Sequence, residues 1–106
     1  MDIQFTDRQL DIMNILWDRG SSTVREAKEE IEEDLAYTSV LTVFQTLEEK
    51  GHVRHEREGK AYRYYPAVTR QETGRQAVRY VLRRLFDGSP EALVRALGTD
   101  GDVSGP

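Results

Sequence analysis

Residues 37–51 read YTSVLTVFQTLEEKG, and this stretch decides the fold that we expect for the chain. As a helix, it carries an apolar stripe along one side, which needs a core to cover it. That stripe consists of Val40, Val43, Phe44 and Leu47. The opposite side holds threonine, serine and glutamine, which are short polar side chains suited to close contact with a polar groove. Gly51 then ends the helix. The alternative interpretation is an ordinary core helix with a polar outer side.

Two more helices are expected before this stretch. Thr6 and Thr23 each begin a capping-box pattern, with Gln or Glu three residues later. We expect the first helix over about residues 7–18 and the second over about residues 24–33. Only residues 34–36 then separate the second helix from the third, which is the spacing of a helix-turn-helix. In that motif the second of the two helices enters the major groove of DNA.

Downstream of Gly51 the apolar period changes from helical to alternating. Residues 53–58 and 61–65 alternate on either side of Gly59–Lys60, which predicts a β-hairpin. Three helices followed by a basic hairpin is the element order of a winged helix. We therefore expect a mainly α fold with a small β-hairpin, a winged helix-turn-helix formed by residues 1–68, followed by C-terminal dimerisation helices.

The C-terminal part predicts two further helices, over about residues 70–86 and from Pro90 to Gly98. Their apolar residues fall outside the core that the first three helices and the hairpin close. The same segment of a second chain would cover them most economically, which predicts a homodimer through residues 69–98. The expected dimer contacts are Val78, Val81, Leu82, Leu85, Phe86, Leu93, Val94 and Leu97. We expect residues 99–106 to form a disordered polar tail.

Charge is unevenly distributed along the chain. The net charge of −4 by itself argues weakly against nucleic acid, yet ten bases and only three acids lie between Lys50 and Arg84. The binding of phosphate depends on the local electrostatic field, because screening limits the reach of a charge to about 8–10 Å at physiological salt. The bases of the hairpin are therefore candidate phosphate contacts. For the arginines after Arg70, a solvated surface is the favoured interpretation.

The composition excludes several classes of site. Without cysteine the chain has no disulfide, thiolate metal site or thiol nucleophile, and it has only two histidines. The acidic side of the second helix suits a solvated face better than a cation site, so we expect no metal and no cofactor. No segment is apolar enough to cross a membrane, and we expect a cytoplasmic protein. An enzyme is disfavoured because nothing pairs a nucleophile with a base.

These features predict a DNA-binding surface on the third helix and the hairpin. The short polar side chains of that helix would face base edges, where Gln45 can pair with adenine through two hydrogen bonds. Tyr37, Arg25 and the hairpin bases would contact phosphate and fix position without reading sequence. The candidate DNA-binding residues are Arg25, Tyr37, Thr38, Ser39, Thr42, Gln45, Arg57, Lys60 and Arg63. The rival interpretation is a winged helix that binds other proteins without sequence-specific DNA binding.

Several blocks of the sequence also resemble one known family. They are FTDRQLDIMNILW, STVREA, AYTSVLTVFQTLEEKGHV, EREGKAYRYYP and RLFDGSPEALV, in that order over residues 5–97. Together they resemble the bacterial penicillinase repressors of the BlaI/MecI type. The resemblance implies a homodimer that binds double-stranded operator DNA of dyad symmetry and blocks transcription. It also implies that the helix beginning at Tyr37 and Thr38 is the recognition helix, and that the C-terminal helices form the dimer.

Two departures from the family leave the inducing signal open. Members that respond to β-lactams are inactivated when a membrane metalloprotease cuts their C-terminal helical region. The Asn-Phe pair associated with that cut does not occur here, where Ala96-Leu97-Gly98 is the nearest stretch. Copper-responsive relatives carry a C-terminal Cys-x-Cys metal-binding pair, and this chain has no cysteine. The resemblance therefore supports repression, and leaves open whether a sensor protease is a partner.

Overall fold

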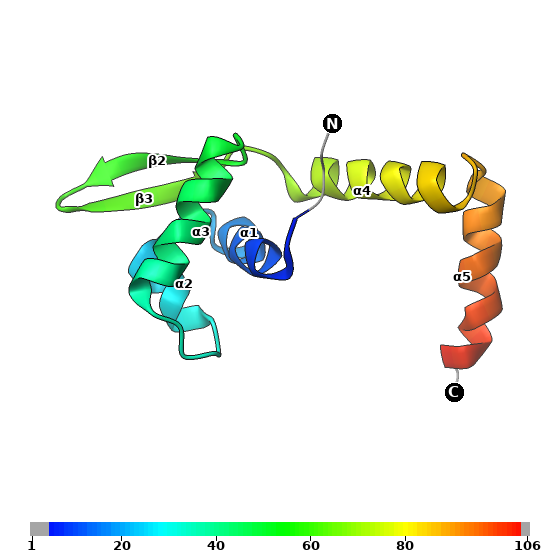
Figure 1. Cartoon of the computed structure of the whole chain (residues 1–106), viewed down its shortest axis with the longest axis horizontal. Helices are drawn as coiled ribbons and strands as arrows, with labels where there is room; N and C mark the ends of the chain where they lie inside the picture. Colours follow the sequence, from blue (N-terminus) through cyan, green and yellow to red (C-terminus); the bar gives the residue numbers. More distant parts are fainter. Residues whose placement is uncertain (1–4, 105–106) are drawn as a thin grey trace. The chain divides into compact units, whose positions relative to one another are not determined.

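The structure, a computed structural model, describes the backbone of residues 5–104 and the side chains of residues 5–98. These residues divide into two compact units after Arg70. The first unit contains three helices and three strands, and Figure 1 labels the helices and the two longer strands. In chain order they are α1 (Asp7–Arg19), β1 (Ser22–Thr23), α2 (Val24–Glu30), α3 (Tyr37–Glu49), β2 (Val53–Glu58) and β3 (Ala61–Pro66). This order confirms the predicted winged helix-turn-helix.

The capping boxes predicted at Thr6 and at Thr23 are formed. At the start of α1, Thr6 Oγ1 accepts a hydrogen bond from the Gln9 N–H at 3.1 Å, and Gln9 Oε1 accepts one from the Thr6 N–H at 3.0 Å. At the start of α2, Thr23 and Glu26 make the same reciprocal pair at 3.1 and 3.2 Å. Each box satisfies backbone N–H groups that a helix N-terminus leaves without an intrahelical partner.

The second helix is shorter than predicted. α2 ends at Glu30 rather than near residue 33, because Ile31 leaves the helical conformation with φ −81° and ψ 127°. Ile31 and Leu35 are partly buried against the core, so the turn between α2 and α3 covers residues 31–36 and is anchored by its own apolar side chains. The predicted end of this helix near residue 33 was therefore wrong, because core packing overrode the helical period.

The third helix supplies the centre of the core. Val40, Phe44 and Leu47 are at most 1% exposed, and Val43 is partly buried beside them. The ring centroids of Phe44 and Tyr64 lie 4.5 Å apart, which joins α3 to β3. The remaining buried apolar residues are Ile12, Met13, Ile15, Leu16, Val24, Ala27 and Val53. The predicted stripe therefore packs against α1, α2 and the sheet.

The sheet is antiparallel, with strand order β1-β3-β2. β2 and β3 pair from Val53 opposite Pro66 to Glu58 opposite Ala61, so the hairpin turns at Gly59–Lys60 as predicted. Gly59 has φ 63°, the positive value that the first central residue of a type II′ hairpin turn requires. The turn projects beyond the helices in Figure 1, and β2 with β3 forms the wing of the fold.

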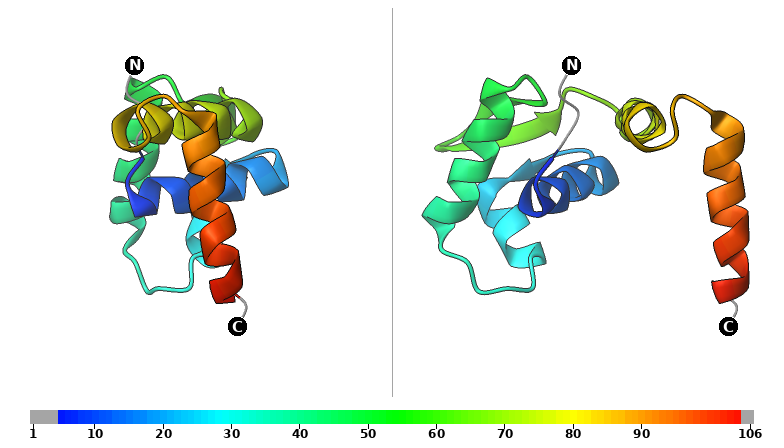
Figure 2. Two further views of the ribbon diagram at one scale, coloured as in Figure 1. Left: turned by 90° about the vertical axis from the view of Figure 1, so that its right-hand side faces the viewer. Right: turned by 45° about the vertical axis from the view of Figure 1, so that its right-hand side comes forward.

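The second unit contains α4 (Arg70–Leu85) and α5 (Pro90–Ser104), whose helical backbones are seen in both views of Figure 2. α4 has no buried residue, and Ser89 Oγ caps α5 by accepting from the Ala92 N–H at 3.1 Å. More than half of each of four apolar side chains is exposed: Val78, Leu85, Val94 and Leu97. Val81, Leu82, Phe86 and Leu93 are partly buried. None of the helices within residues 5–104 has both the length and the apolar character that crossing a membrane requires.

The last helix runs farther than predicted. We expected it to stop at Gly98, but α5 continues to Ser104. Gly98 has no positive φ, so it lies within the helix instead of ending it, at a cost of about 1 kcal/mol relative to alanine. The expected polar tail is thus helical as far as Ser104, and its last two positions, 105–106, lie outside the described residues.

Candidate nucleic-acid interface

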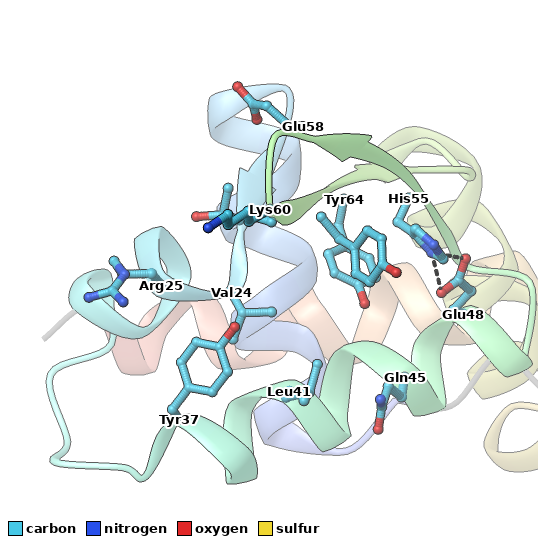
Figure 3. Close-up of a pocket in the computed structure, with 13 residues that line it drawn as sticks. Val24, Arg25, Tyr37, Leu41, Gln45, Glu48, His55, Glu58, Lys60 and Tyr64 are labelled. Carbon is cyan, nitrogen blue, oxygen red and sulfur yellow. Dashed lines mark hydrogen bonds and ion pairs between the residues drawn. The ribbon is translucent and has the colours of Figure 1, made fainter.

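A cleft of about 830 Å³ lies between α3 and the hairpin. Figure 3 shows Tyr37 and Leu41 directed from α3 toward it, and Gln45 also lines it. These three residues are four positions apart, so they form one row along the helix. The full lining is Thr23, Val24, Arg25, Tyr37, Leu41, Gln45, Glu48, His55, Glu58, Lys60, Ala61, Tyr62 and Tyr64. The cleft therefore follows the length of α3 and has the hairpin as its opposite wall.

Aromatic side chains dominate the hairpin wall. His55 lies opposite Tyr64 in the β2–β3 register, and Arg57 lies opposite Tyr62, so these four residues share one face of the hairpin. The ring centroid of His55 is 4.5 Å from that of Tyr62 and 5.5 Å from that of Tyr64. Burial raises the pKa of the Tyr64 phenol, so this part of the wall is uncharged at neutral pH.

The predicted base-reading residues are exposed on α3. Thr38, Ser39, Thr42 and Gln45 all present their side chains to solvent. Thr42 Oγ1 donates to the Thr38 carbonyl oxygen at 2.9 Å, which uses its proton and leaves its oxygen free to accept. No side chain caps the N-terminus of α3, and its first turn holds no acidic residue. The positive end of the helix dipole is therefore open to an anion.

Three of the predicted phosphate contacts are exposed cations near the cleft. Arg25, at the start of α2, and Lys60, in the hairpin turn, both line it. Figure 3 shows them at the same end of the cleft as Tyr37. Arg57 is exposed on β2, where its Nε donates to the Gly59 carbonyl oxygen at 3.2 Å and leaves the two terminal nitrogens of the guanidinium available. α2 and the hairpin thus each contribute positive charge at the cleft.

Arg63 is placed differently from the other predicted phosphate contacts. Strand alternation puts it on the face of β3 opposite Tyr62 and Tyr64, outside the cleft lining. Its Nε donates to Glu58 Oε1 at 2.6 Å, and its two terminal nitrogens donate to the two oxygens of Glu26 at 3.2 Å each. The carboxylates of Glu58 and Glu26 raise the pKa of Arg63. Its charge is therefore balanced within the protein.

The structure also brings into the cleft two residues that we did not predict there. His55 Nδ1 lies 2.7 and 2.8 Å from the two carboxylate oxygens of Glu48, a contact drawn in Figure 3. This pair joins β2 to the last turn of α3. No local signal in the sequence indicates it, because the two residues belong to different elements and meet only after the hairpin folds back.

The acidic residues around α2 lie apart from the cleft. Glu30, Glu32 and Glu33 line a separate hollow with Asp11 and Asn14, and this hollow shares no residue with the cleft. Arginines of α1 pair with some of these acids at 2.6–3.3 Å. Within the part of the chain that the structure describes, no cluster of three or more potential metal-ligating side chains is found. These carboxylates therefore lie outside the cleft, whose own acidic lining residues are Glu48 and Glu58.

Comparison with known proteins relates this chain to one protein family. The model of the penicillinase repressor family matches residues 5–105. The transcriptional regulator BlaI of Mycobacterium tuberculosis is 41% identical over 69 residues, which cover 62% of this chain and 50% of that protein. The chain thus spans about half the length of this relative. The penicillinase repressor of Bacillus licheniformis is 22% identical over 104 residues, covering 96% of this chain and 81% of that protein.

Solved structures show the same fold. The solution structure of the DNA-binding domain of the repressor BlaI superposes with a TM-score of 0.58 at 24% identity, over 65% of this chain and 87% of that one. The crystal structure of YusO from Bacillus subtilis superposes with a TM-score of 0.55 at 22% identity, over 93% of this chain and 74% of that one. These identities support the fold alone. Because the family model matches nearly the whole chain, the protein belongs to the penicillinase repressor family, as the resemblance of its sequence blocks predicted.

Proposed function

We propose that this protein is a transcriptional repressor that binds operator DNA with α3 in the major groove and the hairpin against the neighbouring backbone. One observation carries the proposal. The polar side of α3 is exposed beside a cleft that has Arg25 and Lys60 at one end. The family match and the DNA-binding domain named for the BlaI structure support it. We propose no catalytic role and no cofactor.

In this proposal the cleft holds the sugar-phosphate strand that borders the major groove. Arg25, Lys60 and Arg57 would contact its phosphates, together with the Tyr37 hydroxyl and the open N-terminus of α3. The aromatic wall of the hairpin would pack against the sugars. Base edges would be contacted by Thr38, Ser39, Thr42 and Gln45. The amide of Gln45 can both donate to and accept from adenine, so it could make a bidentate contact. Sequence specificity would therefore depend on α3 and general affinity on the cations.

We further propose that two copies pair through residues 69–98. The support is the exposed apolar surface of α4 and α5, to which Val78, Leu85, Val94 and Leu97 contribute. A twofold dimer would place its two recognition helices in major grooves one helical turn, about 34–36 Å, or a multiple of it apart, on an operator of matching dyad symmetry. Because the proposed target is genomic DNA, we place the protein in the cytoplasm. The proposal includes no inducer and no sensor protease.

Fluorescence anisotropy tests the proposal directly. The full chain is titrated into a labelled duplex that carries a dyad from upstream of its own gene, and into a scrambled duplex of equal composition, between 50 and 200 mM salt. We expect the dyad duplex to bind about 10³-fold more tightly, with the steep salt dependence of several phosphate contacts. Equal and weak binding of both duplexes at all salt concentrations would contradict DNA recognition and favour a protein-binding winged helix.

A further inference from the structure

Arg63 carries a charge that we first assigned to phosphate binding, but its contacts point to a different role. We propose that Arg63 is a positioning residue: through Glu26 it fixes the wing against the start of α2. In this way it sets the spacing of two cations that would contact phosphate, Arg25 and Lys60. The inference rests on the proposed function and deepens it, since it assigns a residue that would control DNA affinity without touching DNA.

The guanidinium of Arg63 joins three segments of the winged unit. It donates to Glu58 of β2 at 2.6 Å, to both carboxylate oxygens of Glu26 of α2 at 3.2 Å, and to Ser21 Oγ, between α1 and β1, at 3.2 Å. The planar fork of arginine can bind a carboxylate through two nitrogens at once, which fixes direction as well as distance. A lysine ammonium in its place would act as a single point charge and could not hold the same geometry.

Glu26 is the centre of this network. Its carboxylate also accepts from the Thr23 N–H at 3.2 Å, closing the capping box of α2, and from Arg19 of α1 at 3.0 Å. The hydrogen bonds from Arg63 and then from the Thr23 N–H lower the pKa of Glu26, so it is ionised at neutral pH. One carboxylate therefore connects α1, the start of α2 and β3.

The network lies next to both phosphate-binding cations in the sequence. Glu26 directly follows Arg25, and Arg63 lies three residues after Lys60 in the same hairpin. Holding Glu26 against Arg63 therefore fixes the backbone close to each cation. The β1–β3 pairing places Thr23 opposite Arg63, so the register of the short β1 strand brings the partners together. If the network breaks, the wing is free to move relative to α2 and the two cations lose their fixed separation.

Direct phosphate binding by Arg63 fits the contacts less well. Only 22% of its side chain is exposed, and it lies on the sheet face opposite the aromatic cleft wall. Reaching a phosphate would require it to leave both Glu58 and Glu26, and of its two arginine contacts Glu26 would then keep only the one with Arg19. Loss of Arg63 should accordingly weaken DNA binding in two ways, by releasing the wing and by exposing these two carboxylates.

The variant Glu26→Gln separates positioning from simple charge. It removes a negative charge, which by general electrostatics would raise the affinity for DNA. It keeps the capping box, because glutamine serves at that position as well as glutamate does. If the network positions the wing, we expect the affinity instead to fall, by roughly fivefold, as for the loss of a linked set of ion pairs. The matched control is Glu29→Gln, which removes the same charge from an exposed site of α2 and should not lower affinity.

The salt dependence gives a second test. Arg63→Gln should lower DNA affinity by about tenfold, with an unchanged slope of log K against log salt, because no phosphate contact is lost. Lys60→Gln should reduce the magnitude of that slope by about 0.9, as the loss of one phosphate contact does. The double variant with both Glu26→Gln and Arg63→Gln should bind no more weakly than Arg63→Gln alone. A lowered slope for Arg63→Gln, or a gain in affinity for Glu26→Gln, would overturn the positioning role.

Backbone ¹⁵N relaxation of the free full chain tests the inference without DNA. We expect order parameters at residues 57–62 to fall in Arg63→Gln and to stay unchanged in Lys60→Gln. If the wild-type chain showed no selective DNA binding, the proposed function would fail and relaxation would still decide the inference. An equally rigid wing in Arg63→Gln would overturn the inference and leave the function standing. Glu58→Gln, which removes one arm of the network, gives the same comparison if Arg63→Gln does not fold.

Discussion

His55 Nδ1 of β2 lies 2.7 Å from Glu48 Oε2 of α3, at the end of the cleft away from Arg25. The Arg63–Glu26 contact ties the other strand of the wing to the other helix of the helix-turn-helix. Each wing strand is thus joined to one helix before any DNA is bound. Such preorganisation lowers the ordering cost of binding, because the wing need not be fixed when it meets the backbone.

Truncation of Gln45 should reduce sequence selectivity. Gln45→Ala removes the side chain proposed to pair with adenine, so we expect operator affinity to fall by about 1–3 kcal/mol while binding to scrambled duplex barely changes. Competitive anisotropy with the two duplexes measures the ratio. The matched control is Gln71→Ala on α4, which should alter neither affinity. Equal losses on both duplexes would instead assign Gln45 to general backbone binding.

Removal of the Arg25 charge should act on all sequences alike. In Arg25→Gln we expect weaker binding to operator and scrambled duplex by the same factor, and a salt slope lower by about 0.9. Titrations at several salt concentrations give both quantities. Arg54→Gln removes a charge from β2 outside the cleft, where Arg54 pairs with Glu56 at 2.9 Å, and should keep the slope. An unchanged slope in Arg25→Gln would argue against a phosphate contact.

The interpretation of residues 37–51 succeeded because a local pattern was enough to establish it. Val40, Phe44 and Leu47 are all buried, and the capping boxes before α1 and α2 use atoms only three residues apart. Such features can be recognised in the sequence, because backbone geometry fixes both the period of a helix and the three-residue spacing of a capping box. The winged-helix order followed from them.

The errors arose where distant contacts decided the outcome. Ile31 ends α2 early because it packs on the core from an extended backbone. The contact between Arg63, a predicted phosphate contact, and Glu26 was also missed, because the two residues are 37 positions apart and the two-residue strand β1 brings them together. Gly98 stays helical although glycine often ends a helix. Charge and residue type alone do not reveal which arginine already has a partner.

An acid in the apolar stripe of α4 should disrupt the proposed dimer. Val78 is about half exposed in the single chain, and Val78→Glu would place a charge in the proposed contact. Analytical ultracentrifugation should find the mass of two 12.2 kDa chains for the wild type and of one for the variant. Thr73→Glu, which puts the same acid on another side of α4, should remain dimeric. A monomeric wild type would remove the support for a twofold operator.

The lowered pKa of Glu26 predicts a pH dependence of stability. The pKa of Glu26 is lower in the folded protein than its ordinary value of 4.5, which applies in the unfolded chain. The ionised Glu26 therefore stabilises the fold fully above pH 4.5, and this stabilisation is lost as the pH falls through the lower pKa of the folded protein. Urea unfolding should therefore show wild type losing its advantage over Glu26→Gln below about pH 4.5. A constant difference between the two proteins down to pH 3 would contradict the ion-pair network.

Hydroxyl-radical footprinting of the full chain on DNA from upstream of its own gene tests the central claim most directly. If α3 and the wing recognise an operator as proposed, two protected segments should appear, related by a dyad and centred about one or two helical turns apart. Gln45→Ala should weaken this protection. Uniform protection along the fragment, or none at protein concentrations that saturate non-specific binding, would contradict the account of this protein as an operator-binding repressor.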